Sequence, residues 1–295
     1  MPAHIHILSP SGAIDPSYID GAARRLREWG FEVSEALHAR GQWGRFAATD
    51  DERLADLMQA MENPAVDMIL CARGGYGLQR IIDRLPEVNK PIVGFSDITA
   101  LHQLSGLCGQ PSLHAVMCKH IATLPEDSAP LAGLRRALTG GDLHYTWPTH
   151  PLNRCGDACG PVVGGNLSVL YGLQATPYSL AHLSYQFPIL LIEDVGERHY
   201  HIDRMMRNLR MSGVLAHLSG LIVGQFTDCD DDPSMPGGSV EQTIYEAVAD
   251  YNYPVVFAAP IGHVDANMPL WLHSSSELHV TPDTVSIHIQ SPLES

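Results

Sequence analysis

Three short motifs, far apart in the sequence, carry a serine, a glutamate and a histidine that could act together on a carbonyl group. The first is Gly94-Phe95-Ser96, which lies between an apolar run and a helical pattern. A serine on such a sharp turn stands clear of the sheet, and the next backbone N–H helps to bind an oxyanion. The general pattern has a second glycine where this chain has Ile98. The alternative is that Ser96 or Asp97 only caps the following helix.

A nucleophilic serine needs a base, and the base needs a group that orients it. His263 follows the apolar run 254–258 in a loop and comes directly after Gly262. Glu193 follows the apolar run 187–192, and a carboxylate there could hold an imidazole in one tautomer and stabilise the imidazolium. Two alternatives stay open. Most of the sixteen histidines are structural or on the surface, and Glu193 could pair with Arg198 or Arg204.

A glycine-rich loop, Arg73-Gly74-Gly75-Tyr76-Gly77, is a second candidate for contact with a ligand. Gly74 and Gly75 allow positive φ angles and close approach of a ligand to the backbone N–H groups. The loop is not a G-x-G-x-x-G motif and lacks the lysine of a phosphate-binding loop, so a dinucleotide site is not favoured.

Alternating strands and helices must position these motifs. Apolar runs at 5–8, 31–36, 66–72 and 91–95 predict strands, and the patterns at 16–29 and 49–61 predict helices between them. Repeated strand–helix units indicate a parallel sheet covered on both faces, with ligands beyond the carboxyl ends of its strands. The glycine loop and Ser96 both follow such strands, so we expect them at the same edge.

The alternating pattern lapses into Pro, Gly and polar residues after 145. We therefore predict an α/β domain over 1–145, a linker over 146–163 and a smaller domain over 164–295. The second domain is expected to be α+β. Its predicted strands lie at 187–192, 220–226, 254–258, 277–280 and 285–289, and its predicted helices at 201–211 and 240–251.

Charge and cysteine usage exclude several classes of protein. The chain has 18 basic and 33 acidic residues, hence a net charge of −15, and no basic run, which argues against a nucleic-acid partner. The start of the chain lacks the features of a secretory signal, and six scattered cysteines suggest reduced thiols, so a cytoplasmic protein is expected. The uncharged stretch 161–192 is broken by Gly, Pro and polar residues, so no membrane span is expected.

No pattern favours a metal site or a cofactor. Cys155 and Cys159 have no second close ligand pair with zinc spacing. The pairs His4/His6 and His199/His201 lack a third ligand at useful spacing. The acidic run 228–232 has proline where a calcium-binding EF-hand loop needs glycine.

Taken together, the motifs resemble those of the LD-carboxypeptidases of serine peptidase family S66. The matching pieces follow the family's order over nearly the whole chain: Ser9-Pro-Ser-Gly12, Arg45-Phe-Ala47, Arg73-Gly-Gly-Tyr-Gly77, Gly94-Phe-Ser-Asp-Ile-Thr-Ala100, Gly164-Gly-Asn166, Leu191-Ile-Glu-Asp194, Ile202-Asp-Arg-Met205 and Gly262-His263. The chain departs from the family at Met268-Pro-Leu-Trp271, where a Leu-Pro-Leu-Gly run is common. It also has His114-Ala-Val-Met117 in place of a common Gly-Pro-Met.

The resemblance implies a flavodoxin-like, class I amidotransferase-like first domain and a second domain of the swivelling β/β/α type. It implies catalysis by Ser96, Glu193 and His263, with Glu197 as the second choice of carboxylate. The oxyanion hole would be the backbone N–H groups of Asp97 and Gly75, and no metal or cofactor would take part. Substrate binding would fall to Arg73, Gly74 and Asn166.

The implied substrate is a murein tetrapeptide, cut between the L-centre of its diamino acid and the terminal D-Ala during cell-wall recycling, by an enzyme that is often a homodimer. Two other hypotheses remain open. One is a microcin-resistance hydrolase, which cleaves peptidyl or aminoacyl nucleotide conjugates with the same triad. The other is a catalytically silent protein that binds muropeptides. A class I amidotransferase would need cysteine where this chain has Ser96.

Overall fold

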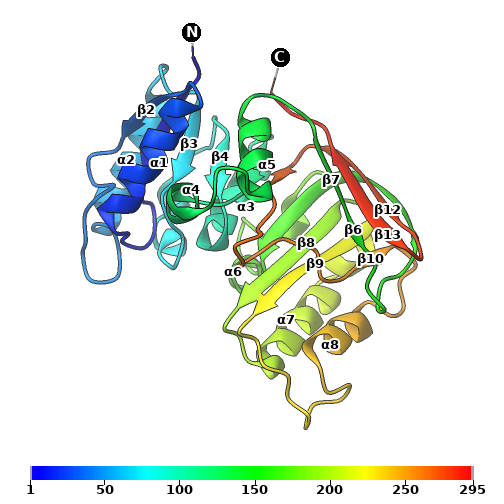
Figure 1. Ribbon diagram of the computed structural model, residues 1–295. Helices are drawn as coiled ribbons and strands as arrows, with labels where there is room; N and C mark the ends of the chain where they lie inside the picture. Colours follow the sequence, from blue (N-terminus) through cyan, green and yellow to red (C-terminus); the bar gives the residue numbers. More distant parts are fainter. Residues whose placement is uncertain (1, 294–295) are drawn as a thin grey trace.

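The computed structural model describes residues 2–293, which form two sheets with helices packed against them (Figure 1). The first sheet has six strands in the order β11-β5-β4-β3-β1-β2, parallel except for β11. The order 2-1-3-4-5 of its first five strands is the flavodoxin-like order, so this expectation is confirmed. Its strands are β1 (His4–Leu8), β2 (Glu32–Glu35), β3 (Met68–Cys71), β4 (Ile92–Gly94), β5 (Ser112–His114) and β11 (Leu270–Leu272).

The first two helices around the first sheet begin where the sequence predicts them. The carboxylate of Asp15 accepts a hydrogen bond from the Ser17 N–H at the start of the first helix. Thr49 and Glu52 form a capping box at the start of the second. The helices of this half are α1 (Pro16–Glu28), α2 (Asp50–Glu62), α3 (Thr99–Leu107), α4 (Cys118–Thr123) and α5 (Ala129–Leu138).

The second sheet is half parallel and half antiparallel. It has seven strands in the order β10-β9-β8-β7-β12-β13-β6, with parallel pairing from β10 to β7 and antiparallel pairing beyond. Helices α7 and α8 pack together below its parallel half (Figure 1). The elements are β6 (Leu143–Pro148), β7 (Gly156–Asn166), α6 (Leu167–Leu173), β8 (Ile189–Val195), α7 (His199–Met211), β9 (Gly220–Thr227), α8 (Val240–Ala247), β10 (Val255–Val256), β12 (Ser275–Val280) and β13 (Thr284–Ile289).

The prediction of a linker over 146–163 is wrong. Residues 156–163 begin β7, the longest strand, and 146–148 end β6. The sequence pattern did not predict this strand because it contains glycine and proline, which are typical of loops. Gly156 and Gly160 have φ values of 148° and 146°, and a side chain at Gly160 would lie 2.9 Å from the carbonyl oxygen of Phe187. The glycines are required by close packing within a sheet.

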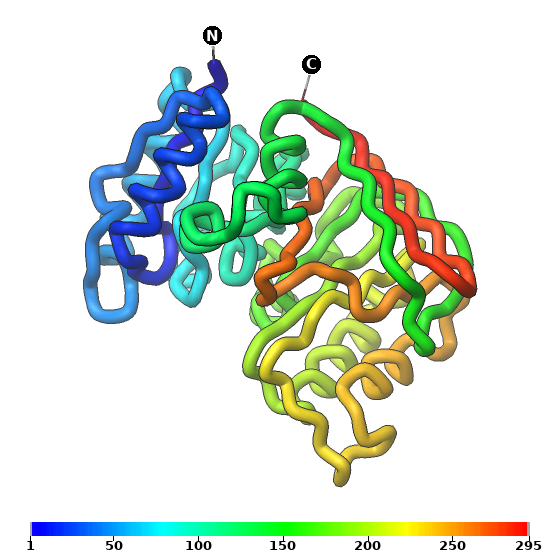
Figure 2. The backbone as a smooth tube through the Cα atoms, viewed as in Figure 1, coloured from blue at the N-terminus to red at the C-terminus, as the bar shows by residue number. Residues whose placement is uncertain are grey.

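The chain crosses between the two sheets more than once. Strand β11, from the second half, pairs with β5 of the first sheet, Leu270 opposite His114. Figure 2 follows the orange segment that leaves β10 of the second sheet and reaches β11 of the first. The loop that carries His263 lies on this crossing segment. No helix among residues 2–293 is long and apolar enough to cross a membrane.

Candidate active site

Ser96 occupies a strained turn at the end of β4. Its φ is +68°, in the left-handed region, and Phe95 before it is extended. A positive φ is uncommon for a non-glycine residue and indicates a strained backbone turn. A nucleophile elbow has a strained turn of this kind. Gly94 fits the turn because a side chain there would lie 3.0 Å from Ile98. Within the described residues, Ser96 Oγ caps no helix.

Asp97 ties together the loops that follow three neighbouring strands. Its buried Oδ2 accepts hydrogen bonds from Ser11 Oγ (2.6 Å) and from the N–H of Leu78 (3.0 Å). Burial raises the pKa of the Asp97 carboxyl, and these two hydrogen bonds act in the opposite direction. The side chain therefore holds the elbow in place and does not cap α3. Its backbone N–H lies next to Ser96.

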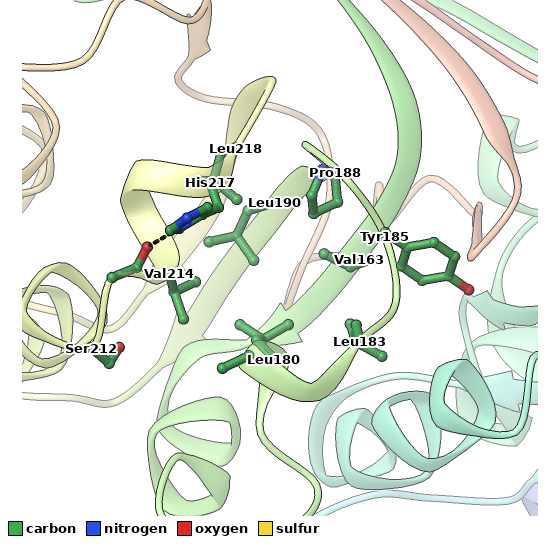
Figure 3. Close-up of a pocket in the computed structure, with 12 residues that line it drawn as sticks. Val163, Leu180, Leu183, Tyr185, Pro188, Leu190, Ser212, Val214, His217 and Leu218 are labelled. Carbon is green, nitrogen blue, oxygen red and sulfur yellow. Dashed lines mark hydrogen bonds between the residues drawn. The ribbon is translucent and has the colours of Figure 1, made fainter.

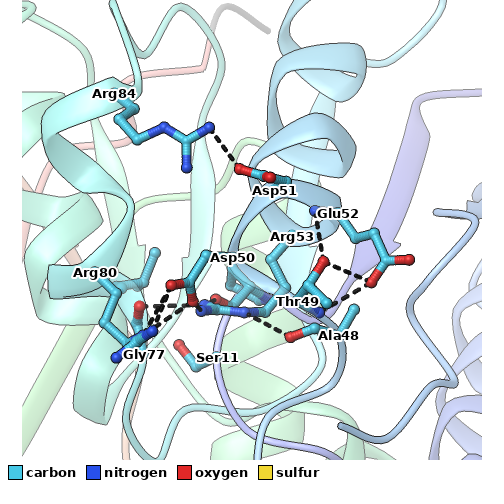
Figure 4. A network of polar contacts seen from close by, with 12 residues as sticks. Ser11, Ala48, Thr49, Asp50, Asp51, Glu52, Arg53, Gly77, Arg80 and Arg84 are labelled. Carbon is cyan, nitrogen blue, oxygen red and sulfur yellow. Dashed lines mark hydrogen bonds and ion pairs between the residues drawn. The ribbon is translucent and has the colours of Figure 1, made fainter.

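A buried arginine holds the far end of the glycine loop (Figure 4). Arg53, from α2, donates to the carbonyl oxygens of Pro10 and of Gly77, the latter at 3.1 Å, and pairs with Asp50 at 2.5 Å. Arg80 also binds Asp50, at 2.6 Å. The capping box of α2 thus starts a helix whose first turn fixes the loops after β1 and β3. Sequence analysis did not single out Arg53.

Gly74 packs directly under the nucleophile. A methyl group at this position would lie 2.8 Å from Cβ of Ser96 and 3.1 Å from its Oγ. We expect Gly74→Ala to fold but to push Ser96 out of position, lowering kcat by about 100-fold, since errors of about 1 Å in a reacting group have effects of this size. Steady-state kinetics beside thermal unfolding would check this. Unchanged kcat would mean that Ser96 is not the reacting group.

Glu193 and His263 form a hydrogen-bonded pair. His263 Nδ1 lies 2.7 Å from Oε2 of Glu193, which is fully buried in β8. Gly262 has a φ of +128°, and a side chain there would lie 3.0 Å from the same oxygen, so only glycine lets the loop approach. Burial lowers the pKa of His263, but the hydrogen bond to Glu193 and the negative charges of Glu193 and Asp194 outweigh it, so the pKa is raised.

Ser96 and His263 line one cavity of about 540 Å³. The ring of Phe95, next to Ser96, packs on the His263 ring with centroids 4.9 Å apart. Within residues 2–293, neither Ser96 Oγ nor His263 Nε2 hydrogen bonds to another protein group. Contacts between a nucleophile and its base are often longer without substrate and tighten when it binds. Tyr18, Lys119 and His120 are among the lining residues of this cavity to which no sequence motif pointed.

A smaller cavity of about 230 Å³ opens on the other side of Ser96. Gly75 and Asp97 line it, as does Asn166 at the end of β7. The Asn166 amide donates to Asp194 Oδ1 at 2.9 Å, its Oδ1 accepts from the Val169 N–H at the start of α6, and its backbone N–H donates to Thr99. One amide N–H of Asn166 is left for a ligand. Ser96, Gly75 and Val195 line both cavities, and the two together are called the cleft.

Asp194 lies beside the triad carboxylate and is almost fully buried. It accepts hydrogen bonds from the N–H groups of Ser168 (2.8 Å) and Val195 (2.9 Å). Burial raises the pKa of Asp194 from 3.8 to about 6; the charge of Glu193 acts in the same direction and the hydrogen bonds oppose it.

Because the folded state then holds a proton that the unfolded state releases, the free energy of unfolding falls as pH rises from 3.8 to about 6. The loss attributable to Asp194 is about 3 kcal/mol. Asparagine does not ionise, so Asp194→Asn should not lose this stability. We therefore expect the free energy of unfolding of the variant, relative to that of the wild-type chain, to rise by about 3 kcal/mol as pH increases from below 3.8 to above 6. Urea unfolding at a series of pH values measures this. A difference independent of pH would show that Asp194 ionises normally in the fold.

Other sequence candidates lie elsewhere or do other work. Glu197 pairs with His201 at 3.0 Å on the first turn of α7. Arg73 donates from Nη1 to the carbonyl oxygen of Ala13 at 2.6 Å, and it lines the larger cavity. In the described part of the chain no group of three His, Cys, Asp or Glu side chains could hold a metal ion, and Cys155 and Cys159 are free and exposed.

A further cavity, of about 280 Å³, lies against the second sheet and is mostly apolar (Figure 3). Its one histidine, His217, bonds through Nδ1 to the carbonyl oxygen of Gly213 at 2.9 Å. This cavity has no nucleophile beside a base, so the cleft around Ser96 is the better candidate for the active site.

Comparison with known proteins identifies the family. The family models for the LD-carboxypeptidase N-terminal domain and C-terminal domain match residues 5–115 and 159–278. A protein of Bacillus subtilis described as a probable murein peptide carboxypeptidase is 30% identical, with 96% of this chain and 91% of that protein covered. The murein tetrapeptide carboxypeptidase of Pseudomonas aeruginosa is 28% identical, with 88% and 87% covered.

Solved structures share the whole architecture. The crystal structure of muramoyltetrapeptide carboxypeptidase from Oxalobacter formigenes superposes with a TM-score of 0.86 at 25% identity, covering 98% of this chain and 99% of that one. The microcin C7 self-immunity protein MccF, in complex with glutamyl sulfamoyl guanosine, has a TM-score of 0.82 over 98% of this chain and 96% of its own at 19% identity, a likeness of fold alone. The chain belongs to the LD-carboxypeptidase family of serine peptidases, and it is a hydrolase of the carboxypeptidase type.

Proposed function

We propose that this protein is a serine LD-carboxypeptidase that releases the terminal D-Ala of murein tetrapeptides. The observation that supports this most is the Glu193–His263 pair, hydrogen bonded at 2.7 Å and lining one cleft with Ser96 on its strained turn. The relatives whose names specify a murein peptide substrate supply the substrate class.

The proposed mechanism uses only side chains and backbone of this chain. His263 takes the proton of Ser96 Oγ as the oxygen attacks the scissile carbonyl, and Glu193 stabilises the imidazolium that forms. The N–H groups of Gly75 and Asp97 receive the oxyanion, a contribution of roughly 3 kcal/mol per donor. His263 then protonates the leaving amine of D-Ala. Water, deprotonated by the same histidine, hydrolyses the acyl-enzyme.

The charges around the cleft suit a substrate that ends in a carboxylate. The larger cavity has two cationic side chains, Arg73 and Lys119, on its lining, and one carboxylate, Asp15, which accepts the N–H of Ser17 at the start of α1. We assign the terminal carboxylate to this side, because an arginine can bind a carboxylate through two parallel hydrogen bonds. Asn166, which lines the smaller cavity, offers its remaining amide N–H to the acyl part of the substrate. Gly74 lines the larger cavity and offers its backbone there.

A panel of substrates tests this assignment. We expect D-Ala release from a diaminopimelate-containing tetrapeptide, no D-alaninamide release from the same peptide ending in a D-Ala carboxamide, and no cleavage of aminoacyl sulfamoyl nucleosides. The amide analogue removes the terminal charge alone, so it isolates the role of the cationic side. Turnover of the nucleoside conjugates without D-Ala release would favour the microcin-resistance hypothesis. A well-folded chain that only binds the tetrapeptide would be the silent homologue.

We further propose that the enzyme works in the cytoplasm, on fragments recycled from the wall, and as a homodimer. The six cysteines of the chain are free, and Cys71 and Cys118 are buried thiols, which suits a reducing compartment. Fractionation of cells expressing the natural protein and sedimentation at several concentrations would test these two points separately.

A further inference from the structure

Beneath the catalytic pair lies a histidine that the mechanism does not use. His114, the last residue of β5, is fully buried. Its ring lies 5.8 Å, centroid to centroid, from the ring of Phe95, which also packs on His263. Neither ring nitrogen of His114 has a hydrogen-bond partner within the described residues. Buried polar groups are rarely left unpaired, so these two nitrogens call for an explanation.

Other buried atoms of the same region are also unpaired in residues 2–293, among them Nδ1 of His102, whose ring lies 6.3 Å from that of His114. Two of these atoms bear on the catalytic pair. One is Oε1 of Glu193, the carboxylate oxygen that faces away from His263, and the other is Nδ2 of Asn267. Both residues are fully buried. Asn267 reaches the catalytic loop by its other end, because its Oδ1 accepts the N–H of Gly262 at 2.9 Å.

The unpaired atoms are chemically complementary. Glu193 Oε1 is an acceptor, Asn267 Nδ2 is a donor, and a neutral imidazole has one donor and one acceptor. Burial lowers the pKa of His114 to about 4, so the ring is neutral at physiological pH. The negative charge of Glu193 acts to raise that pKa, and Leu270, three residues after Asn267, pairs with His114 in the first sheet.

We propose that His114 is a positioning residue for the triad, donating to Glu193 Oε1 from one ring nitrogen and accepting from Asn267 Nδ2 with the other. This inference rests on the proposed function only in naming the reaction. The contacts close a ring that runs from Glu193 Oε1 through His114 and Asn267 to Gly262 and His263, and back to Glu193 Oε2. Such a ring fixes both partners of the catalytic pair.

The proposed ring of hydrogen bonds also explains what holds the crossing segment in place. Leu270, which begins β11, pairs with His114 in the sheet, so the segment 262–270 is anchored to β5 at the residue that would orient Glu193. The catalytic histidine, its carboxylate and the first sheet are then held by one connected set of hydrogen bonds. Networks of this kind hold geometry well only when every member is satisfied.

His114→Phe and His114→Gln separate positioning from packing. Phenylalanine fills the space but offers no hydrogen bond, whereas glutamine keeps a donor and an acceptor. We expect His114→Phe to lower kcat about 10–100-fold with little change in KM, as is usual for groups that orient a reacting group through another. We expect His114→Gln to recover most of this loss. His273→Asn is the control, since His273 is another buried histidine but bonds to the carbonyl oxygen of His102 and lies outside the ring.

Two readouts need no peptide substrate. The first is the rate at which a fluorophosphonate phosphonylates Ser96 Oγ with loss of fluoride. The second is the proton NMR signal of His263 Nδ1–H, which its hydrogen bond to Glu193 shifts downfield. Both are expected to change in His114→Phe and to stay as in the wild-type chain in His273→Asn.

The proposal is overturned if His114→Phe leaves the labelling rate and the Nδ1–H signal unchanged. It is also overturned if phenylalanine and glutamine impair both equally, because His114 would then be merely structural. A wild-type chain that reacts with the fluorophosphonate and shows the signal, yet releases no D-Ala, would contradict the proposed substrate and leave the test of the ring intact.

Discussion

Replacing Ser96 by alanine is expected to lower kcat for D-Ala release by about 10⁴- to 10⁶-fold, because the acyl-enzyme can no longer form. Substrate affinity should change little, since the cleft keeps its other lining residues. The comparison requires kcat from steady-state release and the dissociation constant of the tetrapeptide from calorimetry. Removing a hydroxyl from a strained turn is also expected to leave the fold intact, which circular dichroism would verify.

Ser105→Ala is the matched control for this variant. Ser105 lies nine residues further along, in α3, where its buried hydroxyl donates to the carbonyl oxygen of Leu101 at 2.9 Å. We expect Ser105→Ala to keep kcat within a factor of about three, because the Ser105 hydroxyl bonds within its own helix and takes no part in the reaction. Comparable activity in Ser96→Ala and Ser105→Ala would refute the role given to Ser96.

Replacing Glu193 by glutamine is the second change with a very large expected effect. The amide keeps the size of the side chain but cannot hold His263 in the right tautomer or stabilise the imidazolium, so kcat is expected to fall about 10⁴-fold. The matched control is Glu197→Gln, four residues on, where the carboxylate pairs with His201 on α7. Glu197→Gln should retain nearly full activity. The reverse outcome would move the triad carboxylate to Glu197.

The pH profile of Glu193→Gln carries independent information. The base must be neutral to act, so activity in the wild-type chain is lost as pH falls through the raised pKa of His263. Removing the Glu193 charge leaves burial as the main influence, which lowers that pKa. The acid limb of kcat/KM is therefore expected to move to lower pH in the variant. An acid limb that stays in place would mean that another group titrates.

Local signals in the sequence predicted four of the six strands of the first sheet, β1 to β4, and its first two helices. Helices α1 and α2 begin within one residue of the predicted starts at 16 and 49. The turn at Ser96 has the positive φ that an elbow motif implies. These features depend on a few neighbouring residues, so the sequence alone is enough to find them.

The features that depend on distant contacts could not be predicted this way. Strand β7 is interrupted by glycines whose need arises only from the opposing strand and from Thr99, which a side chain at Gly165 would approach within 2.6 Å. The pairing of β11 with β5 joins segments about 150 residues apart. Lys119 and His120 line one cavity with His263, which comes from a loop about 140 residues later in the chain.

The pairing of Glu193 with His263 shows both sides of this division. Sequence motifs nominated both residues, but the structure adds that Glu193 is fully buried within β8 and that Gly262 is what lets the loop reach it. For Asp97 the sequence offered a helix cap as an alternative role. In the structure its side chain instead joins three loops through hydrogen bonds with Ser11 and Leu78.

The most direct test of the account is D-Ala release from a diaminopimelate-containing murein tetrapeptide, measured for the wild-type chain and for Ser96→Ala with EDTA present. The account predicts release by the wild-type chain alone, at a rate unaffected by the chelator. Release by Ser96→Ala, loss of activity with EDTA, or no release by a well-folded wild-type chain would each contradict it.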